Sequence, residues 1–186
     1  MRKFMLALVC MIVPFAFWSC EEAEELVGSI DMTLEELVGS IDMTLGDKQI
    51  AIPAAVFANI DGTTTVAGTN VQESIAISFK GSATGSYTLG LGKTKLEALR
   101  NVTNITDMEN TLVYVPSSGI KDDGMTAIYG ELTITKYSAN KVEGKFTGYG
   151  LKTSVLNGDF DLSNLQDQLQ EFRGDFEAVG GTIPQL

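Results

Sequence analysis

The sequence of 186 residues contains no histidine, and it has very little cysteine or tryptophan. Histidine is a frequent metal ligand and the base of Ser-His-Asp and Cys-His catalytic sites, so its absence excludes those sites. The two cysteines, Cys10 and Cys20, and the single tryptophan, Trp18, all lie near the start of the chain. We therefore expect no catalytic residue, no cofactor and no metal site. An enzyme built from this chain would have to use carboxylates, lysine, tyrosine or serine.

Basic residues are also few. The chain has 13 lysines and arginines against 24 aspartates and glutamates, which gives a formal net charge of −11. Phosphate groups repel such an acidic surface, so the balance disfavours binding to nucleic acid or to anionic membrane surfaces. The composition therefore predicts a soluble domain without a nucleic-acid partner.

The start of the chain has the form of a signal peptide. Met1-Arg2-Lys3 is basic, and an apolar run of about fifteen residues follows. A helix needs roughly twenty apolar residues to span a bilayer, whereas signal peptides combine a basic start with a shorter run. Ser19 and Cys20 follow directly. The segment resembles a bacterial lipoprotein signal, which implies that residues 1–19 are removed and that Cys20 is lipidated. An ordinary signal peptide cleaved elsewhere is the alternative.

Lipidated Cys20 would anchor the protein to the lipid bilayer. Each buried methylene contributes roughly 0.8 kcal/mol, so one acyl chain such as palmitate binds only marginally, whereas two or three chains hold durably. Removal of residues 1–19 takes away Arg2 and Lys3 and no acidic residue, and Cys20 is then the chain's only thiol. No disulfide is therefore expected, and stability must come from burial and backbone pairing.

An eleven-residue segment occurs twice in tandem, because residues 24–34 and 35–45 are identical. In the second copy, residues 40–45 alternate between polar and apolar, which predicts a half-buried strand. The first copy is a spare strand of the same sequence, which either stays in the tether or competes for the same sheet edge. The expected organisation is a lipidated tether over residues 20–39 and a single β-rich domain over residues 40–186.

Short alternating runs separated by turn residues continue along the domain. Asp61-Gly62 predicts a hairpin, residues 95–100 predict a single helical turn, and residues 127–137 are the longest strand candidate, with 142–149 pairing back. We expect roughly seven to ten short strands, the pattern of an all-β antiparallel sandwich or partly open barrel.

The end of the chain changes character. Apolar residues recur at spacings of three and four, which predicts one face of a helix; they are Leu162, Leu165, Leu169, Phe172 and Phe176. Ser163 with Gln166 has the form of a capping box at its start. We expect a short C-terminal amphipathic helix that packs over an open end or edge of the sheet. A helix that binds a partner is the alternative.

Several segments carry the glycine and aromatic residues of β-hairpins: Gly85-Ser86-Tyr87, residues 130–137, residues 141–146 and Asn157-Gly158-Asp159-Phe160. Together with Cys20, they resemble a group of Bacteroidota cell-envelope lipoproteins of unknown function. The resemblance implies a β-rich fold and an outer-membrane address. It also gives the acidic stretch Glu21-Glu22-Ala23-Glu24-Glu25 a meaning as a signal for export to the cell surface; a solvated tether is the other interpretation. Bulky Phe17 and Trp18 depart from the commonest lipobox. The resemblance implies no catalytic residue.

Candidate ligand-binding residues are few. Strand tyrosines could line a sugar-binding face, although they more often fill a half-buried surface; they are Tyr87, Tyr114, Tyr129, Tyr137 and Tyr149. Asp122-Asp123-Gly124 and Asp159-Phe160-Asp161 offer oxygen atoms to calcium but match no EF-hand loop. We favour a non-enzymatic binding or accessory module whose partner is an envelope protein or a glycan. A calycin-like carrier of a small apolar ligand is the alternative, and a carboxylate-dependent hydrolase is a weaker one.

Overall fold

The computed structural model describes residues 39–102, 107–117, 124–156 and 168–180. The chain divides into two compact units, Met1–Glu36 and Leu37–Leu186, and every described residue belongs to the second. Within the described ranges, ten strands and two short helices follow one another: β1 Ser40–Leu45, β2 Lys48–Ile52, β3 Ala55–Ile60, β4 Thr63–Thr69, β5 Glu73–Lys80, β6 Gly85–Gly90, α2 Lys95–Arg100, β7 Thr111–Pro116, β8 Met125–Tyr137, β9 Lys141–Lys152, α4 Thr153–Leu156 and β10 Leu169–Gly180.

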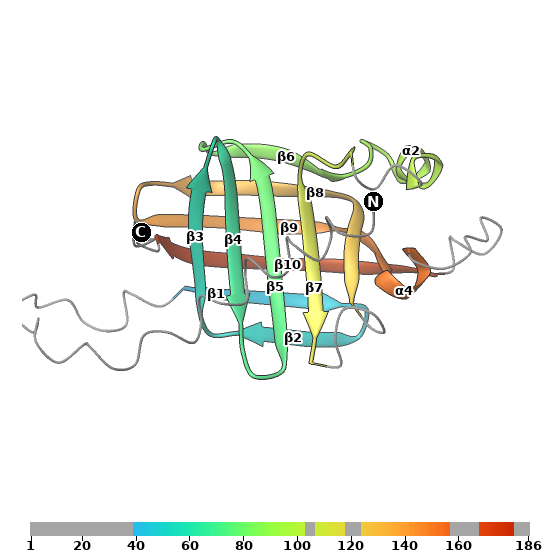
Figure 1. The fold of residues 1–186 in the computed structure, drawn as a ribbon, viewed down its shortest axis with the longest axis horizontal. Coiled ribbons are helices and arrows are strands. Elements are labelled where there is room, and N and C mark those ends of the chain that lie inside the picture. Colours follow the sequence, from blue (N-terminus) through green and yellow to red (C-terminus); the bar gives the residue numbers. More distant parts are fainter. Residues whose placement is uncertain (1–38, 103–106, 118–123, 157–167, 181–186) are drawn as a thin grey trace, which may run out of the picture. The chain divides into compact units, whose positions relative to one another are not determined.

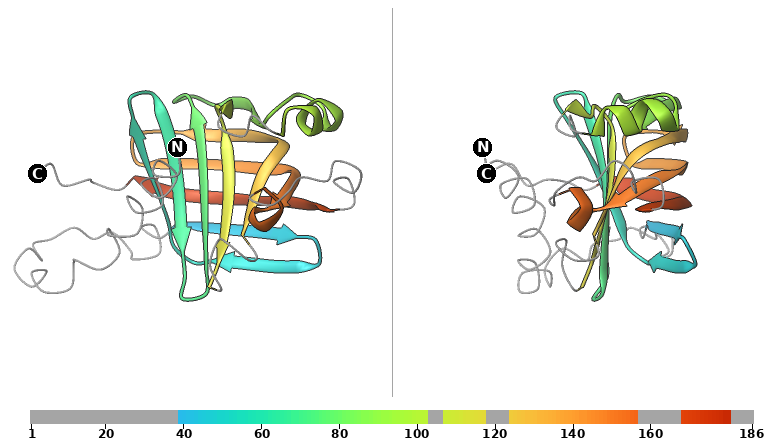
Figure 2. Two further views of the ribbon diagram at one scale, coloured as in Figure 1. Left: turned by 45° about the vertical axis from the view of Figure 1, so that its right-hand side comes forward. Right: turned by 90° about the vertical axis from the view of Figure 1, so that its right-hand side faces the viewer.

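The strands form two layers that face each other. One layer has six antiparallel strands in the order β2-β1-β10-β9-β8-β6, and the other has four in the order β3-β4-β5-β7. Figure 1 shows the four strands crossing the six at a steep angle, as in orthogonal sheet packing. Figure 2 shows the same two layers from the side.

The two layers are joined at both sides into a closed barrel. Val179 and Gly180 of β10 pair in parallel with β3, and Val113 and Tyr114 of β7 pair with β8. Seven strands close the ring, β3-β4-β5-β7-β8-β9-β10, while the β1–β2 hairpin and β6 extend the six-stranded layer beyond it. The expectation of an all-β antiparallel sandwich or barrel is confirmed, and the ring is closed rather than partly open.

Local sequence explains the hairpins. The Asp61-Gly62 turn joins β3 to β4, with φ angles of +52° and +79°. Positive φ at both central residues is the geometry of the tight turns that fit twisted hairpins, which confirms the prediction made from Asp-Gly. Gly46 has a φ of +57° in the turn that joins β1 to β2.

The interior between the layers is filled by one cluster of buried side chains. Alternate residues of each strand supply it, for example Ile41 and Met43 of β1 and Ile77 and Phe79 of β5, all at most 1% exposed. Burial of side chains of this size contributes about 1.5 to 3 kcal/mol each. The residues between them point outward and are mostly polar or charged, for example Asp42 and Thr44 of β1.

The predicted C-terminal amphipathic helix is not shown, and residues 169–180 form β10, which lies between β1 and β9. The prediction failed because a spacing of four residues fits a strand as well as a helix. Along β10 the acidic and basic residues 171, 173, 175 and 177 alternate with Phe172, Gly174, Phe176 and Ala178. β9 pairs with almost all of β10 on one side, and β1 pairs with its central six residues on the other. Leu162, Ser163, Leu165 and Gln166 lie outside the described residues.

Candidate functional site

The outer face of the six-stranded layer carries most of the polar groups that strand alternation turns away from the core. Strand register aligns these groups into rows that cross all six strands. One row is Gln49, Thr44, Arg173, Thr147, Glu131 and Thr88; the next is Ala51, Asp42, Asp175, Lys145, Thr133 and Ser86. Residues of β1 and β10, which are far apart in the sequence, thus become direct neighbours.

An open groove of about 600 Å³ crosses this face over β1, β10, β9 and β8. We call it the charged groove, because Asp42, Lys145, Arg173 and Asp175 line it. All four side chains are exposed. Among the described residues, none of these four side chains has an ion pair or a hydrogen bond. Their hydrogen-bonding groups are therefore available to a ligand.

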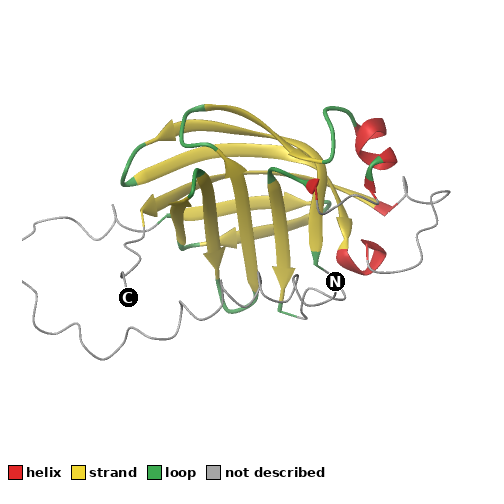
Figure 3. Ribbon diagram, turned by 45° about the horizontal axis from the view of Figure 1, so that its top comes forward, coloured by secondary structure: helices red, strands yellow, loops and turns green. Residues whose placement is uncertain are grey.

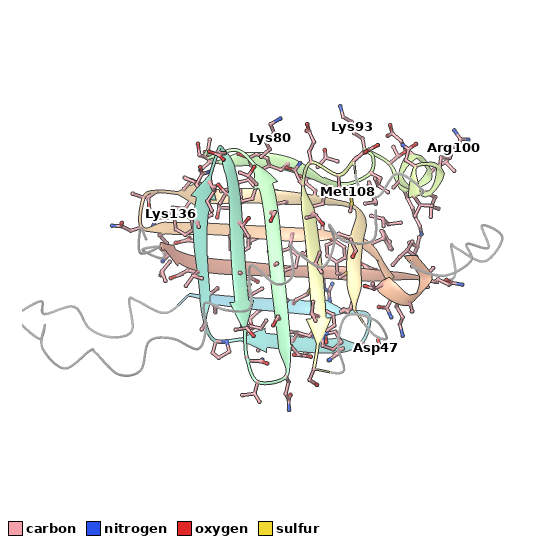
Figure 4. All side chains as sticks on the ribbon, viewed as in Figure 1. Asp47, Lys80, Lys93, Arg100, Met108 and Lys136 are labelled. Atoms are coloured by element: carbon pink, nitrogen blue, oxygen red, sulfur yellow. The ribbon has the colours of Figure 1, made fainter. Side chains whose placement is uncertain are left out.

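A second groove, of about 490 Å³, lies beside it over β6, β8 and β9. We call it the tyrosine groove, because Tyr129 and Tyr149 line it together with Lys93, Glu171 and other polar residues. The two rings are nearly parallel, with 13° between their planes and 6.3 Å between their centroids. Figure 4 shows Lys93 projecting outward beside α2.

A β-bulge in β8 determines that Tyr129 faces outward. The register with β9 shifts between Ala127 and Tyr129, which leaves Ile128 as the extra residue. If alternation continued regularly after buried Ala127, Tyr129 would point into the core. The extra residue shifts the alternation by one position, so Tyr129 points to the outer face instead. Gly90 of β6 allows the bulge to approach, because a Cβ at Gly90 would lie 2.2 Å from the Ile128 carbonyl.

A small second core holds α2 beside the tyrosine groove. Val102, Ile128 and Leu151 are buried in it, and Leu99 and Leu91 pack against them. Thr94 caps the helix by accepting a hydrogen bond from the Glu97 backbone N–H at 3.2 Å. Figure 3 shows both helices at the same end of the six-stranded layer.

This anchoring places the Lys95 ammonium group over Tyr149, 4.4 Å from the ring centroid. A cation at this distance is attracted to the negative face of an aromatic ring. The tyrosine groove thus combines two aromatic rings with a basic group from a different element.

Glu131 lies where the two grooves meet and lines both. Its Oε1 accepts hydrogen bonds from Ser86 Oγ at 2.8 Å and from Thr133 Oγ1 at 3.4 Å. These bonds orient one carboxylate oxygen toward the neighbouring strands. Thr147, directly opposite Glu131 on β9, also lines both grooves.

The structure separates the five tyrosines considered from the sequence. Tyr87 and Tyr137 pack against the core cluster, and Tyr114 is buried within it. Only Tyr129 and Tyr149 belong to the outer face. No pattern in the sequence distinguished these two, because the separation depends on the bulge at Ile128.

A second polar cluster lies toward the interior, where Tyr114 meets Lys48 and Glu73. The Tyr114 hydroxyl donates to Glu73 at 2.9 Å and accepts from Lys48 at 2.7 Å, and Lys48 forms an ion pair with Glu73. Burial raises the pKa of Tyr114, and the hydrogen bond to Glu73 raises the pKa of Lys48. A lysine or tyrosine that acts as a base or nucleophile near neutral pH needs a lowered pKa. These shifts point to a structural link between β2, β5 and β7.

Other residues considered from the sequence lie outside the described ranges. These are Cys20, Asp122-Asp123 and Asp159-Phe160-Asp161, so the predictions of lipidation and calcium binding stay predictions. Within the described ranges, no three acidic residues come together as a metal site would require. No helix in those ranges has the length and apolar character needed to cross a membrane.

The sequence analysis did not identify the charged residues that line the charged groove as candidates. Asp42 and Asp175 are 133 positions apart and meet only because β1 pairs with β10. The strict alternation of charged residues along positions 171–177 was the one available signal.

Comparison with protein-family models gives no match, and no curated protein or solved structure matches the chain significantly.

Proposed function

We propose that the protein is an envelope lipoprotein, anchored through acylated Cys20, and that it acts as a non-enzymatic binding module for glycans. The binding surface in this proposal is the outer face of the six-stranded layer. The observation that carries it is the pair of near-parallel rings of Tyr129 and Tyr149, bordered by unpaired charged groups on the same face.

The chemistry of this face fits a sugar. Aromatic rings offer a flat apolar surface against which the C–H groups of a sugar ring can lie. Carboxylates and carbonyls accept hydrogen bonds from sugar hydroxyls, whereas lysine and arginine donate to them. The tyrosine groove supplies the first kind of contact, and Glu131, Arg173 and Lys145 supply the second.

The mixture of charges favours a neutral ligand. Asp42, Asp175 and Glu131 lie among Arg173 and Lys145 in the charged groove. A ligand with charge of one sign, such as nucleic acid or an acidic peptide, would meet like charges there, and such contacts are unfavourable. A neutral ligand rich in hydroxyl groups can use charges of both signs.

The proposed anchor would allow the domain to stand away from the membrane. Residues 21–39 separate Cys20 from β1, and at about 3.3 Å per extended residue they can span about 60 Å. The acidic residues after Cys20 support export to the outer leaflet of the outer membrane. In this arrangement the domain would reach glycans at the cell surface.

The carrier of a small apolar ligand remains the alternative. A barrel that carries such a ligand needs room inside, and the described interior holds the buried side chains of one continuous cluster. The charged groove and the tyrosine groove are both lined mainly by outward-facing residues. These observations favour the outer face over the interior as the binding surface.

Binding of the mature, detergent-solubilised protein to a panel of neutral and acidic oligosaccharides tests the function. We expect the wild-type protein to bind neutral glycans. Tyr149→Ala should lower the affinity at least about tenfold, whereas Tyr149→Phe should keep it, because stacking needs the ring rather than the hydroxyl. Val56→Ala, on the outer face of the four-stranded layer, is the control. Equal binding by wild type and Tyr149→Ala would contradict the proposal.

The anchor is tested separately. Wild-type protein should incorporate labelled palmitate and fractionate with the outer membrane, and Cys20→Ala should do neither. A Cys20→Ala protein that is cleaved yet still fractionates with membranes would exclude the lipid anchor.

A further inference from the structure

The first strand of the domain occupies an interior position in the six-stranded layer. β1 pairs with β10 along six residues and with β2 along five. Ile41, Met43 and Leu45 point into the core and are 0%, 1% and 8% exposed. The backbone before the strand is equally constrained, because a Cβ on Gly39 would lie 2.3 Å from the Glu177 carbonyl oxygen and 2.4 Å from that of Ala55.

The chain contains a second segment with the same apolar residues and the same preceding glycine. Residues 24–34 are identical to residues 35–45, so Gly28, Ile30, Met32 and Leu34 repeat Gly39, Ile41, Met43 and Leu45. The repeat ends at Leu45, which is also the last residue of β1. The Gly46-Asp47 turn that leads into β2 is not repeated.

We propose that the slot between β10 and β2 accepts either copy, so that residues 29–34 of the same chain exchange with residues 40–45 as the first strand. The side-chain contacts are the same in both forms, because the two copies are identical in sequence. The forms differ in the connection to β2, which is two residues long when the second copy is used and 13 residues long (35–47) when the first is used.

The difference in connection length sets the balance between the two forms. The probability of closing a flexible loop falls roughly as the 3/2 power of its length, so the longer connection is disfavoured by about 17-fold. The exchanged form would then make up about 6% of the molecules. Removing the second copy from the slot should therefore cost on the order of this factor.

Exchange would also change the length of the tether, a consequence that rests on the proposed lipid anchor. The segment between Cys20 and the first strand is 19 residues (21–39) in the observed form and 8 residues (21–28) in the exchanged form. At about 3.3 Å per residue, the maximum reach falls from about 60 Å to about 26 Å. The repeat thus allows two distances between membrane and domain.

Four full-chain variants test the exchange by denaturant unfolding: Met43→Asp, Met32→Asp, the double variant and Ile50→Asp. A buried aspartate in a core strand should lower the folding equilibrium constant on the order of a thousandfold. Ile50 of β2 is 2% exposed and has no second copy, so Ile50→Asp should show this full loss.

Exchange predicts strong non-additivity within the repeat. Met32→Asp should leave the folding equilibrium constant almost unchanged. Met43→Asp should lower this constant only about 17-fold, because Met32 replaces Met43. The double variant should lower it as much as Ile50→Asp does. If Met43→Asp is as damaging as the double variant, or does not fold, the first copy does not enter the slot and the proposal is wrong.

A disulfide test gives a second readout that does not depend on the glycan or lipid proposals. Asp42 lies directly opposite Asp175 on the outer face, so Asp31 would lie there in the exchanged form. In the Met43→Asp background, Asp31→Cys with Asp175→Cys should form an intramolecular disulfide as completely as Asp42→Cys with Asp175→Cys does in the wild-type background. Failure to form it, or only intermolecular disulfides, would overturn exchange within one chain.

Discussion

Phe176 of β10 lies directly opposite Gly144 of β9, and its ring covers that glycine. A Cβ on Gly144 would come within 2.8 Å of both Cε1 and Cζ of the ring. Two further pairs in the same two strands repeat the arrangement, Phe146 opposite Gly174 and Phe172 opposite Gly148. Glycine in these strands thus makes space for aromatic rings that lie against the sheet.

Gly144→Ala should lower the free energy of unfolding by about 1 to 3 kcal/mol, because the added methyl group overfills a packed interior. Urea unfolding measures the change. Phe176→Leu should relieve part of the cost, so the loss in the double variant should be smaller than the sum of the two single losses. Strict additivity would show that the ring is not what restricts position 144.

Stability at high pH should depend on Tyr114. The pKa values of Tyr114 and Lys48 are both raised above their ordinary values of 10.0 and 10.5. Both groups therefore bind their proton more tightly in the folded state. Their contribution is fully present below about pH 10 and is lost as pH rises through the raised pKa values.

Tyr114→Phe should accordingly reduce the loss of stability between about pH 8 and pH 11. It should also cost about 1 kcal/mol at neutral pH, because the hydrogen bonds to Lys48 and Glu73 disappear. Urea midpoints measured across this range give both effects. An alkaline loss as large in Tyr114→Phe as in wild type would contradict the assignment.

Stability at low pH should depend on Glu143. Lys141 Nζ lies 3.0 Å from this carboxylate and 2.6 Å from that of Glu177, and Lys136 Nζ lies 3.5 Å from Glu143. The hydrogen bond from Lys141 lowers the pKa of Glu143 below its ordinary 4.5. The stabilisation is therefore present above about pH 4.5 and is lost as pH falls through the lowered pKa.

Glu143→Gln should remove this part of the acid dependence. The effect should be small and should weaken with salt, because the pair is partly exposed to solvent. Glu171→Gln is the matched control, since it removes the same charge from the same face where no ion pair is formed among the described residues. Identical acid profiles for the two variants would contradict the prediction.

The contact between Lys95 and Tyr149 should hold α2 against the sheet. An exposed cation–π contact contributes about 0.5 to 1 kcal/mol, so Lys95→Ala should speed amide hydrogen exchange in α2 by about two- to fivefold. Arg100→Ala removes the same charge from the same helix and should speed exchange less, because the exposed Arg100 side chain makes no cation–π contact among the described residues. Equal exchange in the two variants would mean that the contact does not hold the helix.

The candidate site was predictable from the sequence only in part. Tyr129 and Tyr149 were among five candidates, but strand alternation alone gives no parity across a bulge, and the extra residue at Ile128 determines which way Tyr129 points. Arg173 lies in a segment that was predicted as a helix, so the sequence analysis did not place it on the face of a sheet. Its neighbours Thr44 and Thr147 come from β1 and β9, and no local pattern could bring the three together.

Local sequence was sufficient for features that depend on neighbouring residues. Alternation predicted β1, and Asp61-Gly62 predicted its hairpin, because turn geometry and side-chain parity are properties of a few consecutive residues. Tertiary structure alone decided that residues 169–180 form a strand. Phe172 and Phe176 suit one face of either a helix or a strand, and pairing with both β1 and β9 made the strand the more stable choice. The same pairing closed the barrel and aligned the polar rows, because register between strands distant in sequence is set only when the chain folds.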